Sequence, residues 1–333
     1  TSHFSLCGEI GGMNWGNGDI YLNNGYAGSL PYLLEISFHE LGHGPPQSFP
    51  RQVIFFMRWM KEAATGNLYR VEVPAELSEI DSVISLMYLD PDLGYVVLSS
   101  TGYGRIRHDY LMASYSNEYA AAKNYSLYRC MCGGQLEGLP PLETLKEQIG
   151  EATEGKTNNE LIRLIHQGIF EMFKERFGDR EDFDEKFSLL QQYMDVGLTD
   201  CSYERAFLPA EDAMRSRERK ERFAEGEHSD IIRANVMLSL FNDYMADDEA
   251  KAYAFLREAV AGPQDDCPTI EGLLSYTNLQ WAIKYSCRKG EKEKARHFLD
   301  LWKEMNNKDP NEWIANRITM FESYLQNETQ TVA

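Results

Sequence analysis

The sequence contains no apolar run long enough to cross a membrane, and cationic residues are scarce. Its 33 lysines and arginines are outnumbered by 52 aspartates and glutamates, which gives a formal net charge of −19. This excess of negative charge argues against binding to nucleic-acid phosphates and against docking on an anionic membrane. A basic protein partner, or solubility alone, fits the charge better. With 43% hydrophobic residues, the chain can bury one large core or two modest ones.

Cysteine is also sparse, and the six thiols lack the dense spacing of a secreted disulfide scaffold. The closest pair, Cys130 and Cys132, is separated by one residue, whereas zinc ribbons and redox motifs generally use two. We therefore expect mostly reduced core thiols and a cytoplasmic protein. Thr1 opens no signal peptide, and the missing initial methionine leaves room for an upstream segment that has been removed.

The glycines near the N-terminus do not form a phosphate-binding loop. The stretches 8–12 and 16–18 lack the P-loop lysine and the G-x-G-x-x-G spacing between a strand and a helix. Only Asp19 to Leu22 has an extended pattern. We therefore expect residues 1–29 to form an irregular cap over the helices that follow.

The segment from Gly18 to Met60 predicts two short helices. Apolar residues from Leu30 to Phe38 recur at the spacing of a buried helical face, and Pro31 suits the first turn. Gly44, Pro45 and Pro46 end this helix, since prolines cannot continue it. A second apolar stripe runs from Val53 to Met60. Two helices joined by a proline-rich turn form the unit of a stacked solenoid.

The first helix also carries the string His39-Glu40-Leu41-Gly42-His43. Two histidines four residues apart leave the same face of a helix and can share one Zn²⁺. Glu40 would then polarise the metal-bound water as general base.

A catalytic zinc ion needs a third protein ligand. Our first candidate is Glu118, because the segment from Asn117 to Ala122 resembles the downstream glutamate helix of the gluzincin metallopeptidases, and His108 is the second. Two features oppose this hypothesis. Little chain precedes the motif to form the sheet of such enzymes, and Gly42 and Gly44 place His43 in a fraying last turn. A sheet beside the histidines and a carboxylate converging on them would favour the peptidase.

Downstream, Val73-Pro74-Ala75-Glu76-Leu77 predicts a helix start with proline and acids in the first turn. Asp90-Pro91-Asp92 ends that helix. A long helix from Asp109 to Met131 follows, with alanines and tyrosines on its buried face.

This order of segments resembles a group of bacterial HEAT-like repeat proteins over about residues 15–135. The segments that carry the resemblance are Gly18 to Tyr21, Tyr26-Ala27, Leu30 to Leu33, Val73 to Leu77 and the alanine-rich helix. The resemblance implies an α-solenoid and implies no activity.

The glycine- and proline-rich stretch from Gly133 to Pro141 predicts a domain boundary. We thus expect a cap with a HEAT-like domain over residues 1–135, a helical domain over 142–326 and a tail over 327–333. Helices are predicted at 158–177, stopped by Gly178, and at 183–194, stopped by Gly197. Residues 211–228 are mostly charged, which indicates a solvated helix.

The last hundred residues contain an internal echo. Lys251 to Leu256 recurs as Lys294 to Leu299, which resembles the helix pairs of the tetratricopeptide class. The whole chain is therefore predicted to be all-α, an α-solenoid that is HEAT-like in its N-terminal half and TPR-like in its C-terminal half.

Two functions remain open, and the sequence favours the first. One is a non-catalytic acidic module, an immunity or regulatory protein that binds a basic protein partner without a cofactor. The other is a zinc metallopeptidase with His39, His43 and Glu118 as ligands, Glu40 as base, and the C-terminal helices recruiting the substrate. The remaining histidines form no further catalytic constellation.

Overall fold

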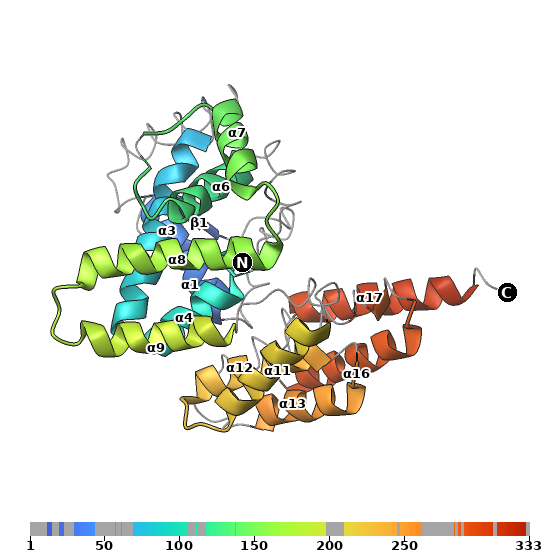
Figure 1. Cartoon of the computed structure of the whole chain (residues 1–333). Helices are drawn as coiled ribbons and strands as arrows, with labels where there is room; N and C mark the ends of the chain where they lie inside the picture. Colours follow the sequence, from blue (N-terminus) through green and yellow to red (C-terminus); the bar gives the residue numbers. More distant parts are fainter. Residues whose placement is uncertain are drawn as a thin grey trace. The chain divides into compact units, whose positions relative to one another are not determined.

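The computed structural model is almost entirely helical, so the predicted all-α class is confirmed (Figure 1). It describes residues 12–14, 20–22, 30–43, 57, 61, 69–104, 111, 118–136, 138–197, 210–244, 247–261, 283, 286–287, 290–308 and 312–330. Across these ranges, no helix has the length and apolar character needed to span a membrane. Contacts divide the chain into two compact units, residues 1–22 with 34–216 and residues 23–33 with 217–333.

The first unit begins with a short antiparallel pair of strands, β1 (Gly12–Asn14) and β2 (Ile20–Leu22). The register pairs Gly12 with Leu22 and Asn14 with Ile20. The extended pattern at residues 19–22 therefore corresponds to β2. The sequence did not indicate β1, because glycines and polar residues dilute any strand pattern there.

The first unit contains most of α1 and, among the described residues, the helices that follow it up to α9. They are α1 (Leu30–Gly42), α3 (Tyr69–Leu89), α4 (Pro91–Ser100), α6 (Glu118–Met131), α7 (Leu142–Thr153), α8 (Asn158–Phe177) and α9 (Phe183–Val196). Helix α3 contacts α4, α6 and α8, while α9 packs on α4 and α8. The predicted second helix at residues 53–60 lies outside the described residues, apart from Met57.

Helix α3 starts earlier than its proline suggests. It begins at Tyr69 and contains Pro74 in its second turn, whereas the sequence predicted a start at Val73. Pro74 removes the donor for the carbonyl of Arg70, and both residues are exposed on the helix surface. The earlier start brings Glu72 into helical register with the residues one and two turns downstream.

Two glycines permit close contacts between these helices. A Cβ atom on Gly94 of α4 would lie 2.5 Å from Met87 Cα of α3, and one on Gly168 of α8 would lie 1.5 Å from the Cys130 carbonyl oxygen of α6. Both contacts involve backbone atoms that cannot move aside independently. Close backbone contacts thus join α4 to α3 and α8 to α6.

The two helices predicted at 158–177 and 183–194 are confirmed as α8 and α9. Thr157 and Glu160 form a capping box at the start of α8. Gly197 ends α9 in the left-handed conformation with φ 72°, as its position predicted.

The glycine- and proline-rich stretch 133–141 does not separate the helices that follow it from those before it. Tyr88 of α3 donates to Asp182 at 2.7 Å, and Tyr193 of α9 donates to Asp92 of α4 at 2.5 Å. The division by contacts falls after Ser216 instead. The domain limits at 135 and 142 remain a prediction.

The second unit consists of helix pairs. Helix α12 (Asp230–Tyr244) packs on α13 (Glu249–Ala261), and α16 (Lys292–Lys308) packs on α17 (Glu312–Gln330). The repeated segments begin α13 and α16, where Ala252 and Ala295 are both buried.

Helix α11 (Ala210–Ala224) departs from the solvated helix that its charges predicted. Lys220 is fully buried, and its ammonium lies 3.1 Å from Asp243 Oδ2 and 2.6 Å from Ser239 Oγ. One face of this charged helix is therefore internal.

Candidate metal centre

The HExxH helix presents three ionisable side chains on one face. Glu35, His39 and His43 follow each other at steps of four residues, which places them in a row along α1. The row faces α3, because Gly42 beside it touches the α3 backbone. A Cβ atom on Gly42 would lie 2.8 Å from Ala75 Cα and 2.7 Å from Ser78 Cβ.

This contact gives Gly42 a packing role at the end of the helix, and His43 lies in the closing turn, as its position predicted. Helix α1 continues through Gly42, and the N–H of His43 donates to the carbonyl of Glu40 at 3.3 Å in the closing turn. The small residue lets α1 approach α3, and the approach brings both imidazoles to the acidic face of α3.

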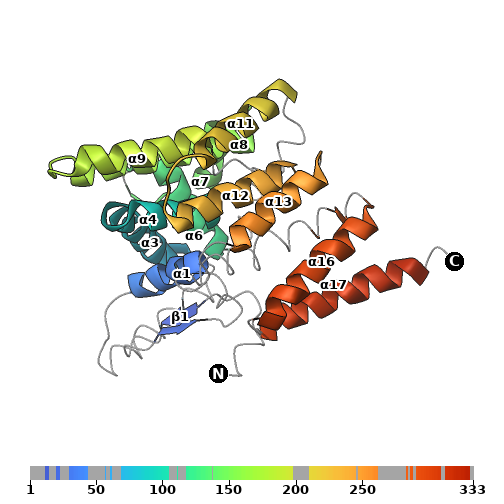
Figure 2. The same ribbon diagram turned by 90° about the horizontal axis from the view of Figure 1, so that it is seen from below.

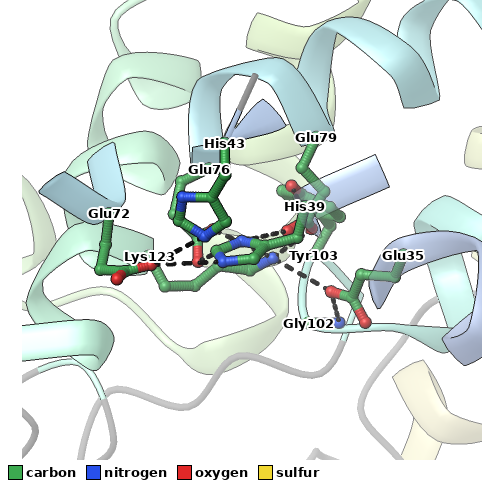
Figure 3. Close-up of polar contacts among 9 residues, drawn as sticks. All are labelled: Glu35, His39, His43, Glu72, Glu76, Glu79, Gly102, Tyr103 and Lys123. Atoms are coloured by element: carbon green, nitrogen blue, oxygen red, sulfur yellow. Dashed lines mark hydrogen bonds and ion pairs between the residues drawn. The ribbon is translucent and has the colours of Figure 1, made fainter. Parts of the chain in front are cut away.

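Helix α3 supplies three carboxylates to meet the row on α1. Glu72, Glu76 and Glu79 lie at helical steps of four and three residues, and all three are buried. Figure 3 shows the two imidazoles among these carboxylates, and the imidazole rings meet edge-to-face with centroids 5.0 Å apart.

Both histidines direct the same ring nitrogen to the same oxygen atom. Nε2 of His39 lies 3.4 Å from Oε2 of Glu72, and Nε2 of His43 lies 3.3 Å from that oxygen. Within the described part of the chain, this buried oxygen accepts no well-directed hydrogen bond. The nitrogen and oxygen atoms of all three residues lie within 4.8 Å of one another.

The two distances to Glu72 match those between ligands of a tetrahedral zinc ion and are longer than charge-assisted hydrogen bonds. A charge-assisted N–H···O bond measures about 2.7–2.9 Å. Ligand atoms held about 2.0–2.1 Å from a tetrahedral zinc ion lie roughly 3.3 Å from each other. The donor set of two imidazoles and one carboxylate is also that of several catalytic zinc sites. The residues present therefore fit a zinc ion.

A second layer of carboxylates orients His39 from its other side. Nδ1 of His39 lies 3.3 Å from Oε1 of Glu76 and 3.5 Å from Oε2 of Glu79. A histidine that binds metal through Nε2 generally donates its Nδ1–H to a carboxylate or carbonyl. Glu76 is placed for that role.

The far end of the cluster is closed by Lys123 of α6. Its ammonium lies 3.0 Å from Glu35 Oε1 and 3.4 Å from Glu76 Oε2, and it also contacts Glu79 Oε1. The turn after α4 adds two donors. The N–H of Gly102 donates to Glu35 at 3.1 Å, and the hydroxyl of Tyr103 donates to Glu79 at 2.7 Å.

The balance of charge in the cluster is negative. Four carboxylates, those of Glu35, Glu72, Glu76 and Glu79, are buried there, and Lys123 contacts all of them except Glu72 among the described residues. Uncompensated buried charges are costly, so the cluster needs further positive charge from protonated imidazoles or from a cation.

The excess of negative charge shifts the pKa values of His39 and Glu72. Burial lowers the pKa of His39, but the carboxylates of Glu72, Glu76 and Glu79 outweigh it and raise the pKa to about 12. Burial raises the pKa of Glu72, but the two neighbouring imidazoles outweigh it and lower the pKa to about 2. In a metal-free chain His39 is thus a cation, and a bound metal ion would replace its proton.

Glu40 lies on the neighbouring face of α1, against the strand pair. A Cβ atom on Gly12 of β1 would lie 2.9 Å from Glu40 Cγ and 2.8 Å from Ile36 Cγ2, and Glu40 itself is 6% exposed. Figure 2 shows β1 beside α1. The structure therefore contains both a small sheet beside the HExxH helix and a carboxylate that converges on the two imidazoles.

The predicted third ligands were Glu118 and His108, but the carboxylate found beside both histidines is that of Glu72. Glu118 begins α6, but its side chain lies outside the described residues, as does the whole of His108. Glu72 takes the converging position instead. Pro74 had suggested a helix start that left Glu72 outside, whereas the four- and three-residue spacing of Glu72, Glu76 and Glu79 was a usable signal.

Other metal-binding side chains in the described ranges do not join this cluster. His166 is fully buried against Tyr95, and Nε2 of His228 lies 2.6 Å from the Phe223 carbonyl oxygen. Cys130 and Cys132 are free thiols. Among the described residues, two groups could hold a metal ion, and both include His39. One contains His43 and Glu72, and the other contains Glu76 and Glu79.

Comparison of the chain with protein-family models, with curated proteins and with solved structures finds no match.

Proposed function

We propose that the first unit is a zinc-dependent hydrolase of the HExxH type, with His39, His43 and Glu72 as metal ligands and Glu40 as general base. The observation that carries this proposal is the convergence of both Nε2 atoms on one buried oxygen of Glu72, at 3.4 and 3.3 Å. Three protein ligands leave the fourth tetrahedral position for water or substrate. Zinc bound there would supply Lewis acidity and acidify that water.

The chain's own residues divide the remaining work. Glu76 and Glu79 hold the His39 ring so that Nε2 faces the metal position. Glu40, next to the ligand His39 in the chain, is the candidate acceptor of a proton from water. Glu40 lies against Gly12 of β1, and an extended strand beside the HExxH helix supports a peptide as the substrate class, because peptide backbones can pair with strand edges.

Metal content tests the ligand set. We expect one zinc ion per chain after removal of metal and reconstitution, measured by mass spectrometry of the purified protein. Glu72→Gln and His39→Ala should lose stoichiometric zinc. Glu118→Gln is the matched control, since it changes the other candidate glutamate in the same chemical way and should retain the ion. Zinc lost in Glu118→Gln and kept in Glu72→Gln would reassign the third ligand.

Hydrolysis tests the role of Glu40. We expect the zinc-loaded chain to cleave peptides from a random-sequence library, and Glu40→Gln to keep the zinc while losing about 10²-fold or more in rate. Glu40→Gln that cleaves at the wild-type rate would remove Glu40 from the mechanism. Zinc binding without cleavage in any peptide pool would leave a structural metal site.

The second unit supports a separate proposal, that its helix pairs stack as repeats and bind a protein. The supporting observation is that the repeated segments of α13 and α16 bury equivalent alanines, Ala252 and Ala295, under paired helices. With a net charge of −19, the partner or substrate expected is a basic protein. Binding of a cationic protein should weaken as salt rises and should be unchanged in Glu40→Gln.

A further inference from the structure

We propose that Lys123 limits the metal centre to a single ion, because its ammonium occupies the place that a second cation would take. This inference rests on the proposed zinc site and concerns the number of ions that it binds. It predicts that removal of the lysine charge opens a second metal position on the Nδ1 side of His39, where Glu76 and Glu79 lie.

The contacts of Lys123 are those of a cation in a carboxylate site. Its ammonium contacts Glu35 Oε1, Glu76 Oε2 and Glu79 Oε1, which come from two different helices. Carboxylates from several helices converging on one position form the usual protein environment of paired metal ions in helical bundles. Here an ammonium stands at that position.

Two of these carboxylates link the two halves of the cluster. Glu76 directs Oε1 to His39 and Oε2 to Lys123, whereas Glu79 directs Oε2 to His39 and Oε1 to Lys123. Each carboxylate therefore has one oxygen on the histidine side and one on the lysine side. On the histidine side both oxygens face Nδ1, so the imidazole of His39 lies between these carboxylates and the proposed zinc position at Nε2.

The lysine is held in this position by its surroundings. Ala120, Ala121 and Ala122 are buried, so α6 lies close to its neighbours. The ammonium also lies 4.3 Å from the centre of the Tyr103 ring, whose hydroxyl donates to Glu79. Because the ammonium is fixed among three carboxylates, a second divalent ion would have to displace it against both charge repulsion and these contacts.

The test compares the number of ions bound by wild type and Lys123→Met. Methionine keeps much of the apolar stem and removes the charge. With Mn²⁺ as the probe, titration followed by electron paramagnetic resonance should give one ion in wild type. Lys123→Met should bind two ions, because the carboxylates that the ammonium contacts would then be open to a second cation. Lys123→Arg, which keeps the charge, should bind one.

Lys251→Met is the matched control for loss of a lysine next to a tyrosine ring. Lys251 lies 4.2 Å from the centre of the Tyr244 ring but pairs with the single carboxylate of Glu221. This variant should bind one ion. A folded Lys123→Met chain that still binds one ion would overturn the inference while leaving the zinc site intact. A wild type that binds no ion would instead overturn the proposed function.

A second variant covers the case in which Lys123→Met does not fold. The double variant Glu35→Gln/Lys123→Met removes one charge of each sign and keeps an oxygen ligand at position 35. It should bind two ions per chain, and a count of one would contradict the role of Lys123. Circular dichroism with and without Mn²⁺ establishes folding in each case.

Discussion

The two units of this chain bury charge in opposite ways. In the second unit, Lys220 and Asp243 are both almost fully buried and pair one to one at 3.1 Å, with Ser239 as an additional partner of the ammonium. In the first unit, four carboxylates are buried in one cluster, and the lysine there contacts three of them. Two imidazole nitrogens converge on an oxygen of the fourth, Glu72, at distances longer than charge-assisted hydrogen bonds. The balanced pair satisfies itself, whereas the unbalanced cluster has room for a cation. Charge balance thus separates a structural pair from a candidate site.

The largest loss of stability is expected when the buried ion pair between Lys220 and Asp243 is broken in the second unit. Lys220→Met leaves Asp243 buried without its cation, which should cost about 3–5 kcal/mol in the free energy of unfolding. Denaturant titration measures this loss. Lys251→Met, which removes a part-exposed lysine, should cost about 1 kcal/mol or less. Equal losses in the two variants would show that burial does not distinguish these pairs.

Zinc should stabilise the first unit by a comparable amount. At a free zinc concentration of 1,000 times Kd, the free energy of unfolding should rise by about 4 kcal/mol. Thermal unfolding with and without zinc tests this in wild type and in His43→Ala, which should gain little. A similar gain in both proteins would mean that zinc binds elsewhere.

The second layer of the cluster should matter less than its ligands. Glu76→Gln weakens the acceptor for Nδ1 of His39, so we expect zinc affinity to fall about 10- to 100-fold with the stoichiometry unchanged. Competition with a coloured chelator measures the affinity. Full loss of zinc in Glu76→Gln would show that Glu76 is itself a metal ligand.

The smallest effect expected is a pH dependence of the metal-free chain. His39 has a pKa raised from 6.5 to about 12, so its contribution to stability is complete below pH 6.5 and declines as pH rises toward 12. From pH 6.5 to 7.5 the loss should be on the order of 1 kcal/mol. Glu72 has a pKa lowered from 4.5 to about 2, so its contribution is present above pH 4.5 and disappears as pH falls toward 2.

These two signs place the greatest stability of the metal-free chain between about pH 4.5 and 6.5. Denaturant titration across pH in the presence of a chelator measures the profile. Glu72→Gln should flatten its acidic side. In the second unit, Lys220→Ala should lower stability across this range, because the buried Asp243 loses its ion pair.

Helix boundaries were predictable wherever the local signals agreed. Glycine after an amphipathic stretch fixed the end of α9, and Pro31 lies in the first turn of α1 as expected. Pro74 misled because an exposed helix tolerates a proline in its second turn when the orphaned carbonyl is also exposed. The histidine pair and Glu40 were evident from spacing alone.

The partner of the histidine pair depended on tertiary structure. Glu72 reaches His39 and His43 only because α1 packs on α3 at Gly42, a contact between residues that are far apart in sequence. The burial of Lys220 in a charged helix is of the same kind, since its acceptors lie on the next helix. Such pairings require knowledge of which helix faces meet.

The glycine between the two histidines has a consequence for any redesign of this centre. A methyl group at position 42 would meet the Ala75 backbone, so the residue there sets the distance between α1 and α3. These two helices carry the proposed zinc ligands. A bulkier side chain would push α1 away from α3 and separate the ligand atoms. The site should then prefer larger ions, such as cadmium, over zinc. Ion selectivity would then be adjustable at a position that never touches the ion.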